Sequence, residues 1–289
     1  MGSNSLMTSS KKTLETRFKK DFGYELNLDS PKDFNEKIQW MKLYYRNPLL
    51  TTCSDKYLVR DYVKDKVGDK YLVPLVGVWD NVDDISFEKL PPNCILKTNW
   101  GCNRSVIKRN NDNFDIEQAK LNLERWMKPE SNHYYSFLEW GYKNIEPKII
   151  CEYLIEPDAN LPPIDYRFFC FNGVPKVIRV DVPFLRPDQA FKNKCRSVYD
   201  LNWNSFSFSW EGRKNIGKCK EDIKQPKNFK EMVEIVKILC KDFIFVRVDL
   251  YNENDSIYFG ELTFYPSAGL SSMPTELNKI LTKDFILPV

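Results

Sequence analysis

The chain has 289 residues, of which 42% are hydrophobic and 29% are charged. This composition supplies enough apolar material for a packed core and excludes a chain that is disordered as a whole. The formal net charge is only +3, which is too small to indicate nucleic acid or an anionic membrane as a partner. The single histidine excludes mechanisms that need two, including typical zinc hydrolase sites.

Neither a membrane span nor a secretory signal is expected. No run of residues approaches the ~18 apolar positions of a transmembrane helix, and the chain starts with small and polar residues. Residues 1–6 look like a cloning remnant, with Met7 as the natural start. No two of the eight cysteines are closer than eight positions, a spacing that predicts reduced thiols rather than a disulfide framework. We therefore expect a cytoplasmic protein.

The first part of the chain predicts helices. Apolar residues recur every three or four positions over residues 14–22 and again over 34–45, which is the spacing of an amphipathic helix. We expect Ser30 with Pro31 to start the second helix. Ser54 is predicted to cap a third helix that ends at Gly68.

From residue 71 the pattern changes to short apolar runs typical of strands. The predicted strands are 71–78, 94–98, 105–108, 148–155, 166–171, 175–182, 243–251 and 257–264. Helices are predicted at 115–127 and 229–240, with a short one near Phe87. Asn172-Gly173 and the polar residues 252–255 each predict a hairpin turn. Residues 186–227 are polar and weakly patterned, and the mixture of elements indicates an α+β or α/β class.

Two carboxylates, Asp249 and Glu261, lie inside apolar strands, where they are costly unless paired or metal-bound. Arg247 shares a strand face with Asp249, and Thr263 shares one with Glu261, because each pair is two residues apart. A register with 249 opposite 259 and 247 opposite 261 brings the four together. Such a patch suits Mg²⁺. A structural Arg247–Glu261 pair on a solvated face fits the same spacing, which does not separate the two readings.

A second signal is Lys97, near the end of the predicted strand 94–98. A small polar loop follows it, with Asn99 and Gly101. A strand lysine and loop N–H groups can together hold a phosphate, although a strand-end lysine that reaches solvent is the alternative. Glu152 is a third carboxylate in an apolar strand and is ambiguous by itself.

In this order along the chain, these motifs resemble the ATP-grasp superfamily and, within it, the TupA-like group, over roughly residues 54–269. The segment 247–266 is similar to the metal-binding end of D-alanine–D-alanine ligases. The resemblance implies an α+β ATP-grasp fold, in which two α/β subdomains grip the nucleotide after a short helical N-terminal region. The implied boundaries are 1–53 for the helical region, 54–154 for the subdomain with the phosphate loop, and 155–289 for the subdomain with the metal site.

The resemblance also assigns residues. It implies Mg²⁺ ligands at Asp249, Glu261 and Thr263, and an Arg247 that steadies an acyl-phosphate. It makes three further catalytic candidates, which would bind phosphate or a substrate carboxylate: Arg167, Lys176 and Arg179. For ATP it implies contacts from Lys56, Lys97, Asn99, Gly101, Glu152, Tyr153, Leu154 and Asp165.

The chain departs from the family pattern in the phosphate loop and in the metal site. Relatives commonly have His-Gly-Ser-Gly where this chain has Trp100-Gly-Cys-Asn, and Asn where it has Thr263. Cys102 in the loop is interpreted as a spectator. His133, in a polar connection, is predicted to lie on the surface.

The implied activity is ATP-dependent ligation of a carboxylate to an amine through an acyl-phosphate, which needs positioning and charge neutralisation more than a histidine base. The carboxylate would be a uronic acid of a bacterial surface polysaccharide or of its nucleotide-sugar precursor. A glycosyltransferase is the alternative, against which the chain has no Asp-x-Asp. A non-catalytic nucleotide or polysaccharide binder is a third possibility.

Overall fold

The computed structural model describes residues 2–110, 113–155, 161–186, 189–211 and 216–288. The chain divides into two compact units, a larger one formed by Met1–Arg46 with Pro157–Val289 and a smaller one formed by Asn47–Glu156. The sequence places the boundaries at 53/54 and 154/155 instead, and those domain limits stay a prediction. Across the described residues, no helix combines the length and apolar character needed to cross a membrane.

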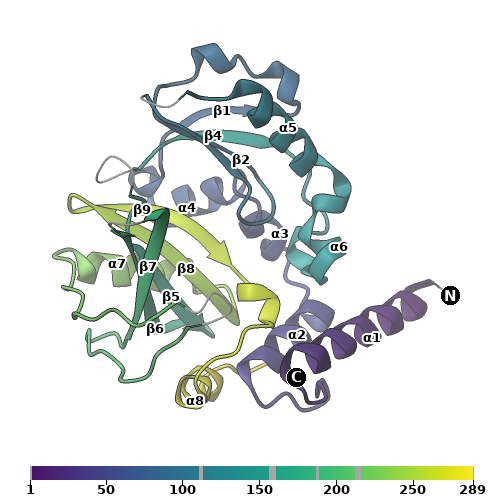
Figure 1. The fold of residues 1–289 in the computed structure, drawn as a ribbon. Helices are drawn as coiled ribbons and strands as arrows, with labels where there is room; N and C mark the ends of the chain where they lie inside the picture. Colours follow the sequence, from purple (N-terminus) through teal and green to yellow (C-terminus); the bar gives the residue numbers. More distant parts are fainter. Residues whose placement is uncertain (1, 111–112, 156–160, 187–188, 212–215, 289) are drawn as a thin grey trace. The chain divides into compact units, whose positions relative to one another are not determined.

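The smaller unit is built on a four-stranded antiparallel sheet in the order β1-β4-β2-β3. Its strands are β1 (Leu75–Trp79), β2 (Cys94–Thr98), β3 (Ser105–Lys108) and β4 (Ile149–Tyr153). Helix α5 (Ile116–Met127) lies along this sheet (Figure 1) and buries Ala119 and Leu123 in a core shared with Leu96 and Ile149. The remaining helical pieces are α3 (Leu49–Ser54), α4 (Val59–Val67), α6 (His133–Phe137), η1 (Asp69–Tyr71), η2 (Val82–Asp84), η3 (Phe87–Lys89), η4 (Pro129–Ser131) and η5 (Trp140–Tyr142).

The predicted cap at Ser54 is wrong. Ser54 ends α3, and the Asp55 carboxylate instead accepts hydrogen bonds from the backbone N–H groups of Tyr57 (2.7 Å) and Leu58 (3.2 Å). An aspartate satisfies such donors as well as a serine does, so the chain turns one residue later than expected. The end of α4 at Gly68 is confirmed, with φ at 96°.

The larger unit contains a five-stranded antiparallel sheet in the order β7-β6-β5-β8-β9 (Figure 1). The strands are β5 (Asp165–Phe171), β6 (Val174–Arg186), β7 (Gln189–Tyr199), β8 (Phe245–Glu253) and β9 (Ser256–Thr263). The helices are α1 (Gly2–Phe22), α2 (Phe34–Tyr44), α7 (Phe229–Leu239), η7 (Pro266–Gly269) and α8 (Thr275–Lys283). The N-cap of α2 is Asp33, which forms a capping box with Glu36. The mixture confirms the α+β class.

The two faces of this sheet differ in chemistry. One face is apolar, and there Phe168 of β5 stacks on Phe229 of α7, with ring centroids 6.4 Å apart. The other face is aromatic at one end, where Phe34 of α2 contacts Phe171 and Phe245 edge-on. Because side chains alternate along a strand, the same face continues into the charged residues of the candidate site.

Both predicted hairpins are confirmed, with turns at Asn172-Gly173 and Asn254-Asp255, all four residues having positive φ. Strand β7 was not predicted. Its segment lacks the run of large apolar residues that marks the other strands, since Cys195, Ser197 and Tyr199 are its buried odd-numbered members.

The expectation that all eight cysteines are free thiols is also wrong. Cys195 of β7 forms a disulfide with Cys219. Residue 218 forms an isolated bridge to Arg196, and this pairing brings the two cysteine Cα atoms to 4.9 Å, within the usual range for a disulfide. A separation of 24 residues along the chain carries no signal of that pairing.

The predicted register of β8 and β9 is wrong, yet the face it predicted is right. The turn has two residues rather than four, so Glu253 pairs with Ser256 and Leu250 with Phe259. Continued unchanged, this register would put Glu261 on the opposite face from Asp249. A bulge at Gly260 adds one residue, and Asp249 pairs directly with Glu261.

The bulge that puts Glu261 on the face of Asp249 needs a glycine at position 260. A Cβ at position 260 would lie 3.0 Å from the Asp249 carbonyl oxygen and 3.1 Å from the Tyr251 ring. We therefore predict that Gly260→Ala lowers the free energy of unfolding by about 1–3 kcal/mol, as overpacking does, when measured by urea titration. The control is Gly217→Ala, where a Cβ meets nothing within 4 Å and a change within about 0.5 kcal/mol is expected. Equal stability of the two variants would contradict the role of the bulge.

Candidate functional site

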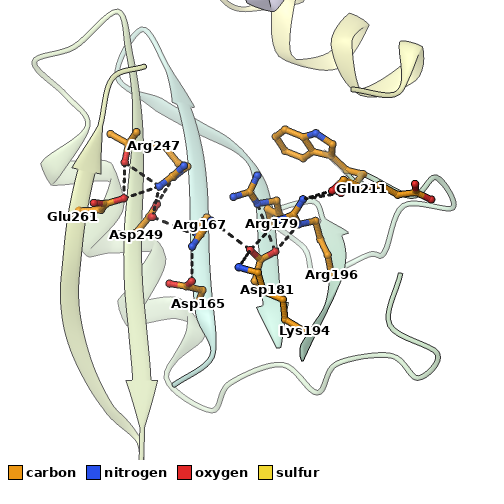
Figure 2. A network of polar contacts seen from close by, with 12 residues as sticks. Asp165, Arg167, Arg179, Asp181, Lys194, Arg196, Glu211, Arg247, Asp249 and Glu261 are labelled. Atoms are coloured by element: carbon orange, nitrogen blue, oxygen red, sulfur yellow. Dashed lines mark hydrogen bonds and ion pairs between the residues drawn. The ribbon is translucent and has the colours of Figure 1, made fainter. Parts of the chain in front are cut away.

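A ladder of charged and polar side chains crosses one face of the larger sheet (Figure 2). It is defined by Glu261 and Thr263 of β9, Arg247 and Asp249 of β8, Asp165 and Arg167 of β5, Arg179 and Asp181 of β6, and Lys194 and Arg196 of β7. Successive members within a strand are two residues apart, so they share a face. The register places Asp249 beside Arg167, and Asp181 beside Arg196.

Arg247 is the centre of the β8–β9 end. Its guanidinium donates to both Asp249 carboxylate oxygens at 2.6 and 2.5 Å, to Glu261 Oε1 at 2.8 Å and to Thr263 Oγ1 at 2.9 Å. Thr263 Oγ1 in turn donates to Glu261 Oε1 at 2.9 Å. The four residues predicted to meet therefore do meet, and one buried arginine joins them.

Burial sets the electrostatics here. Burial raises the pKa of Asp249 to about 6, although Arg247 and Arg167 pull it down. The side chain of Asp249 is 3% exposed, whereas that of Glu261 is 38% exposed. Glu261 is therefore the carboxylate of this pair that solvent or a ligand can reach.

Arg167 connects this end to the rest of the ladder. Its guanidinium contacts Asp165 at 2.5 Å, Asp181 at 3.4 Å and Asp249 at 3.5 Å. Burial alone would lower the pKa of Arg167, but Asp165, Asp249 and Asp181 raise it, so the side chain stays charged. The predicted residues Asp165 and Arg167 thus lie within the site.

At the β6–β7 end Arg179 was predicted, whereas Asp181, Lys194 and Arg196 were not. Asp181 receives two hydrogen bonds from Arg196, at 2.6 and 3.0 Å, and one from Lys194 at 3.3 Å. Burial raises the pKa of Asp181, but Arg196, Arg179 and Arg167 hold it far below its usual value. A signal was available, because Arg179-Val-Asp181 repeats the spacing of Arg247-Val-Asp249.

Arg179 is a buried cation with spare hydrogen-bonding capacity. Its guanidinium lies 4.8 Å from the Trp210 ring centroid and 5.7 Å from that of Phe169. Burial and the neighbouring Arg167 lower its pKa well below the usual value. Arg179 Nε and Trp210 Nε1 are both buried without a hydrogen-bond partner, so this end of the ladder can accept an anionic or acceptor-rich ligand.

Lys176, the other cation predicted on β6, lies outside the ladder. It is the bulged residue of β6, since Val177 pairs with Phe169 and Pro175 with Cys170. Its ammonium contacts Asp284 at 3.0 Å, and the side chains of Lys176 and Asp284 are 35% and 40% exposed.

The predicted metal ligands fit Mg²⁺ in chemistry, because Asp249, Glu261 and Thr263 offer hard oxygens on neighbouring strands. Arg247 lies between them and already bonds to all three. Within the part of the chain that the structure describes, no group of three or more His, Cys, Asp or Glu side chains forms a metal-binding arrangement.

In the smaller unit the predicted nucleotide residues form an ion-pair network. Lys97 Nζ contacts Glu152 Oε2 at 2.6 Å, and Arg60 Nη1 contacts Glu152 Oε1 at 2.7 Å. Ile95 pairs with Glu152 in the sheet, which puts Lys97 and Glu152 on one face. Arg60, which was not predicted, also donates to the Val73 carbonyl at 2.9 Å.

The predicted phosphate loop is fixed by a buried amide. Asn99 donates to Asp55 Oδ2 and to the Glu146 carbonyl, each at 2.9 Å, and accepts from the Lys148 N–H at 2.8 Å. Its side chain thus positions the loop. Lys56 Nζ donates to the Gly101 carbonyl at 2.5 Å, so both predicted members lie at the same loop.

Tyr153 and Leu154 follow Glu152 at the end of β4. Tyr153 is 49% exposed, and its N–H donates to the Pro74 carbonyl. The predicted surface position of His133 is wrong, because its side chain is only 13% exposed and its ring contacts Glu139. His133 begins a short helix, α6, which the polar sequence around it did not predict.

Comparisons with known proteins give a family match. The model of the TupA-like ATP-grasp family matches residues 36–286. Among solved structures, D-alanine–D-alanine ligase from Bacillus anthracis is similar at 15% identity over 74% of this chain and 57% of that chain, with a TM-score of 0.41. VanG D-Ala:D-Ser ligase from Enterococcus faecalis is similar at 10% identity over 81% of this chain and 61% of that chain, with a TM-score of 0.48. Phosphoribosylamine–glycine ligase from Thermotoga maritima is similar at 10% identity over 76% of this chain and 51% of that chain, with a TM-score of 0.45.

The chain therefore spans between about half and three-fifths of the length of these ligases. No curated protein sequence gives a significant match.

The ladder itself makes a stability prediction. Asp181→Asn removes the carboxylate that compensates Arg196 and Arg179, so we expect a loss of about 3 kcal/mol or more in the free energy of unfolding. The control is Asp284→Asn, which removes the partner of the half-exposed Lys176 and should cost under about 1 kcal/mol.

The pH dependence follows from the same group. The folded-state pKa of Asp181 is depressed, so its stabilisation is present above the unfolded value of about 4 and is lost as pH falls below it. Urea titrations between pH 7 and pH 3 should show this loss in the wild type and a smaller one in Asp181→Asn. Parallel curves for the two proteins would contradict the assignment.

Proposed function

The chain belongs to the TupA-like ATP-grasp family, and on that premise we propose that it is an ATP-dependent ligase that joins a carboxylate to an amine through an acyl-phosphate. The observation that carries the proposal is the contact of Arg247 with Asp249, Glu261 and Thr263 on one sheet face. This arrangement places two carboxylates and a cation where phosphate oxygens and a divalent ion can be held together.

In this proposal Asp249, Glu261 and Thr263 hold Mg²⁺, which when bound supplies charge neutralisation for the ATP phosphates. Glu261 is the accessible ligand, and Arg247 keeps Asp249 oriented through two hydrogen bonds. Arg247 would then be shared between the carboxylates and the phosphoryl oxygens. The arginine thereby positions the reacting groups without any proton transfer by a histidine.

The nucleotide residues would be those of the two described networks. Lys97 would give up Glu152 for phosphate, while Arg60 retains that carboxylate. Lys56 would contribute beside the Gly101 carbonyl. The remaining proposed contacts are Asn99, Tyr153, Leu154 and Asp165.

The substrate carboxylate would be a uronic acid of a bacterial surface polysaccharide or of its nucleotide-sugar precursor, joined to a small amine in the cytoplasm. The unpartnered donors Arg179 Nε and Trp210 Nε1 support this choice, because a guanidinium beside an aromatic ring suits an anionic sugar. Arg167 is the neighbouring cation on β5. Lys176 would act only if it left Asp284.

The metal site is tested by Asp249→Asn and Glu261→Gln, which remove charge without changing volume. Each should abolish ATP- and Mg²⁺-dependent hydroxamate formation from a uronic acid and hydroxylamine, because hydroxylamine traps an acyl-phosphate. Asp284→Asn, with a partly exposed carboxylate outside the ladder, should retain the activity. Sugar transfer from a nucleotide donor without ATP turnover would establish a glycosyltransferase instead.

The nucleotide assignment is tested separately by calorimetry. Lys97→Ala should weaken Mg-ATP binding by roughly 1.5–3 kcal/mol, the usual value of a charge-assisted contact. Lys120→Ala in α5, where the ammonium lies 3.9 Å from Glu117 and over the Phe87 ring, should leave binding unchanged. Equal ATP affinity of the two variants would remove Lys97 from the site.

A further inference from the structure

Cys102 differs from the other cysteines of the chain. Cys195 and Cys219 are disulfide-bonded, and five of the six free cysteines are buried. Cys102 alone is both free and exposed among the eight, all of which are described. It lies in the loop between β2 and β3, and its surroundings are not those of an ordinary surface thiol.

The sulfur of Cys102 is followed by a histidine and a glutamate in a chain of contacts. His133 Nε2 lies 3.9 Å from Cys102 Sγ, and His133 Nδ1 lies 3.1 Å from Glu139 Oε2. Glu139 is 4% exposed, so its carboxylate is shielded from water and directed at the ring. Phe137 and Tyr142 contact the imidazole at centroid distances of 5.6 and 5.4 Å and hold its orientation.

The loop is shaped to bring the sulfur to this ring. Gly101 has φ at 76°, and a Cβ there would lie 3.0 Å from Arg104 Nη1 and 3.3 Å from His133 Cδ2. Asn103 also has positive φ, and its amide donates toward Cys102 Sγ at 3.7 Å. A side chain at position 101 would force the loop away from His133.

Charge around the sulfur is positive. Burial lowers the pKa of His133, but its contacts with Cys102 and Glu139 raise it to about 9, so the ring is an imidazolium at neutral pH. Arg104 also interacts electrostatically with Cys102, and its Nη1 is buried without a hydrogen-bond partner. The other charged or titratable groups near this cluster are Glu139, Arg125 and Tyr142.

We propose that Cys102, His133 and Glu139 form a reactive-thiol site at which low-molecular-weight anionic disulfides modify Cys102. In the resting ion pair the thiol proton is already held by the His133 imidazolium, and the Cys102 thiolate attacks one sulfur of the disulfide. The disulfide S–S bond breaks as the Cys102–sulfur bond forms. The departing thiolate receives the proton from His133, so the Cys102 sulfur is oxidised and the leaving sulfur is reduced.

Each residue has a separate task in this step. His133 touches the reacting sulfur, whereas Glu139 is a positioning residue that fixes the ring through Nδ1. Arg104, with an unused donor beside the loop, favours a carboxylate-bearing disulfide over a neutral one. The site lies within residues 101–139 and does not depend on the proposed ligase activity.

The experiment uses the full chain, purified without reductant, with oxidised glutathione as the probe and adduct formation followed by intact and peptide mass spectrometry. One adduct is expected, on Cys102, and none in Cys102→Ser. His133→Gln should lower the rate at pH 7 about tenfold, and Tyr135→Phe, an exposed position on the same helix, should not change it. Arg104→Gln should slow modification by oxidised glutathione but not by neutral hydroxyethyl disulfide.

The pH profile separates a chemical role from a structural one. In the wild type the rate should change little between pH 6 and pH 8, whereas in His133→Gln and Glu139→Gln it should rise by about tenfold per pH unit, as for an ordinary thiol. The wild-type profile needs no variant, so it decides the matter even if a variant does not fold. An ordinary-thiol profile in the wild type, or equal rates with and without His133, would overturn the proposal.

Discussion

The charged face of the larger sheet depends on the ion pair between the buried guanidinium of Arg247 and the carboxylate of Asp249. Asp249 is almost fully desolvated, and an unpaired carboxylate at such a depth is strongly disfavoured. Arg247 compensates it with two hydrogen bonds and reaches across to Glu261 with the same Nη2 atom. The contact can form only because Gly260 provides the bulge that restores the face of Glu261. Backbone geometry and electrostatics therefore depend on one another at this point.

Similar ion pairs compensate the other buried charges on this face of the sheet. Arg167 is shared by Asp165, Asp181 and Asp249, and Asp181 is shared by four cations, Arg167, Arg179, Lys194 and Arg196. Removing Asp181 would leave the buried Arg179 and Arg196 without the carboxylate that compensates them. The apolar face packs on α7, while the charged face remains available for chemistry.

Much of this could be predicted from the sequence, because period-two spacing fixes faces. Arg247, Asp249, Glu261 and Thr263 were placed together by spacing, and Asn172-Gly173 by turn chemistry. What spacing does not encode is register, and the two-residue turn and the bulge each shift it by one. Contacts between distant segments could not be predicted from the sequence either. Arg196 lies in a stretch without apolar patterning. Cys219 meets Cys195 only through the pairing of residue 218 with Arg196.

The two ends of the ladder differ in a way that bears on function. At the β8–β9 end Arg247 has every nearby acceptor engaged, so a ligand there must compete with Glu261 and Thr263 for the guanidinium. At the β6–β7 end Arg179 is held between aromatic rings, and its Nε makes no hydrogen bond although Asp181 Oδ1 lies 3.7 Å away. A cation whose pKa burial has lowered gains from an anionic ligand, because the ligand replaces lost solvation. On the proposed ligase function, an anionic substrate would gain most at β6 and β7, and phosphate would have to compete with the carboxylates of β8 and β9 for Arg247.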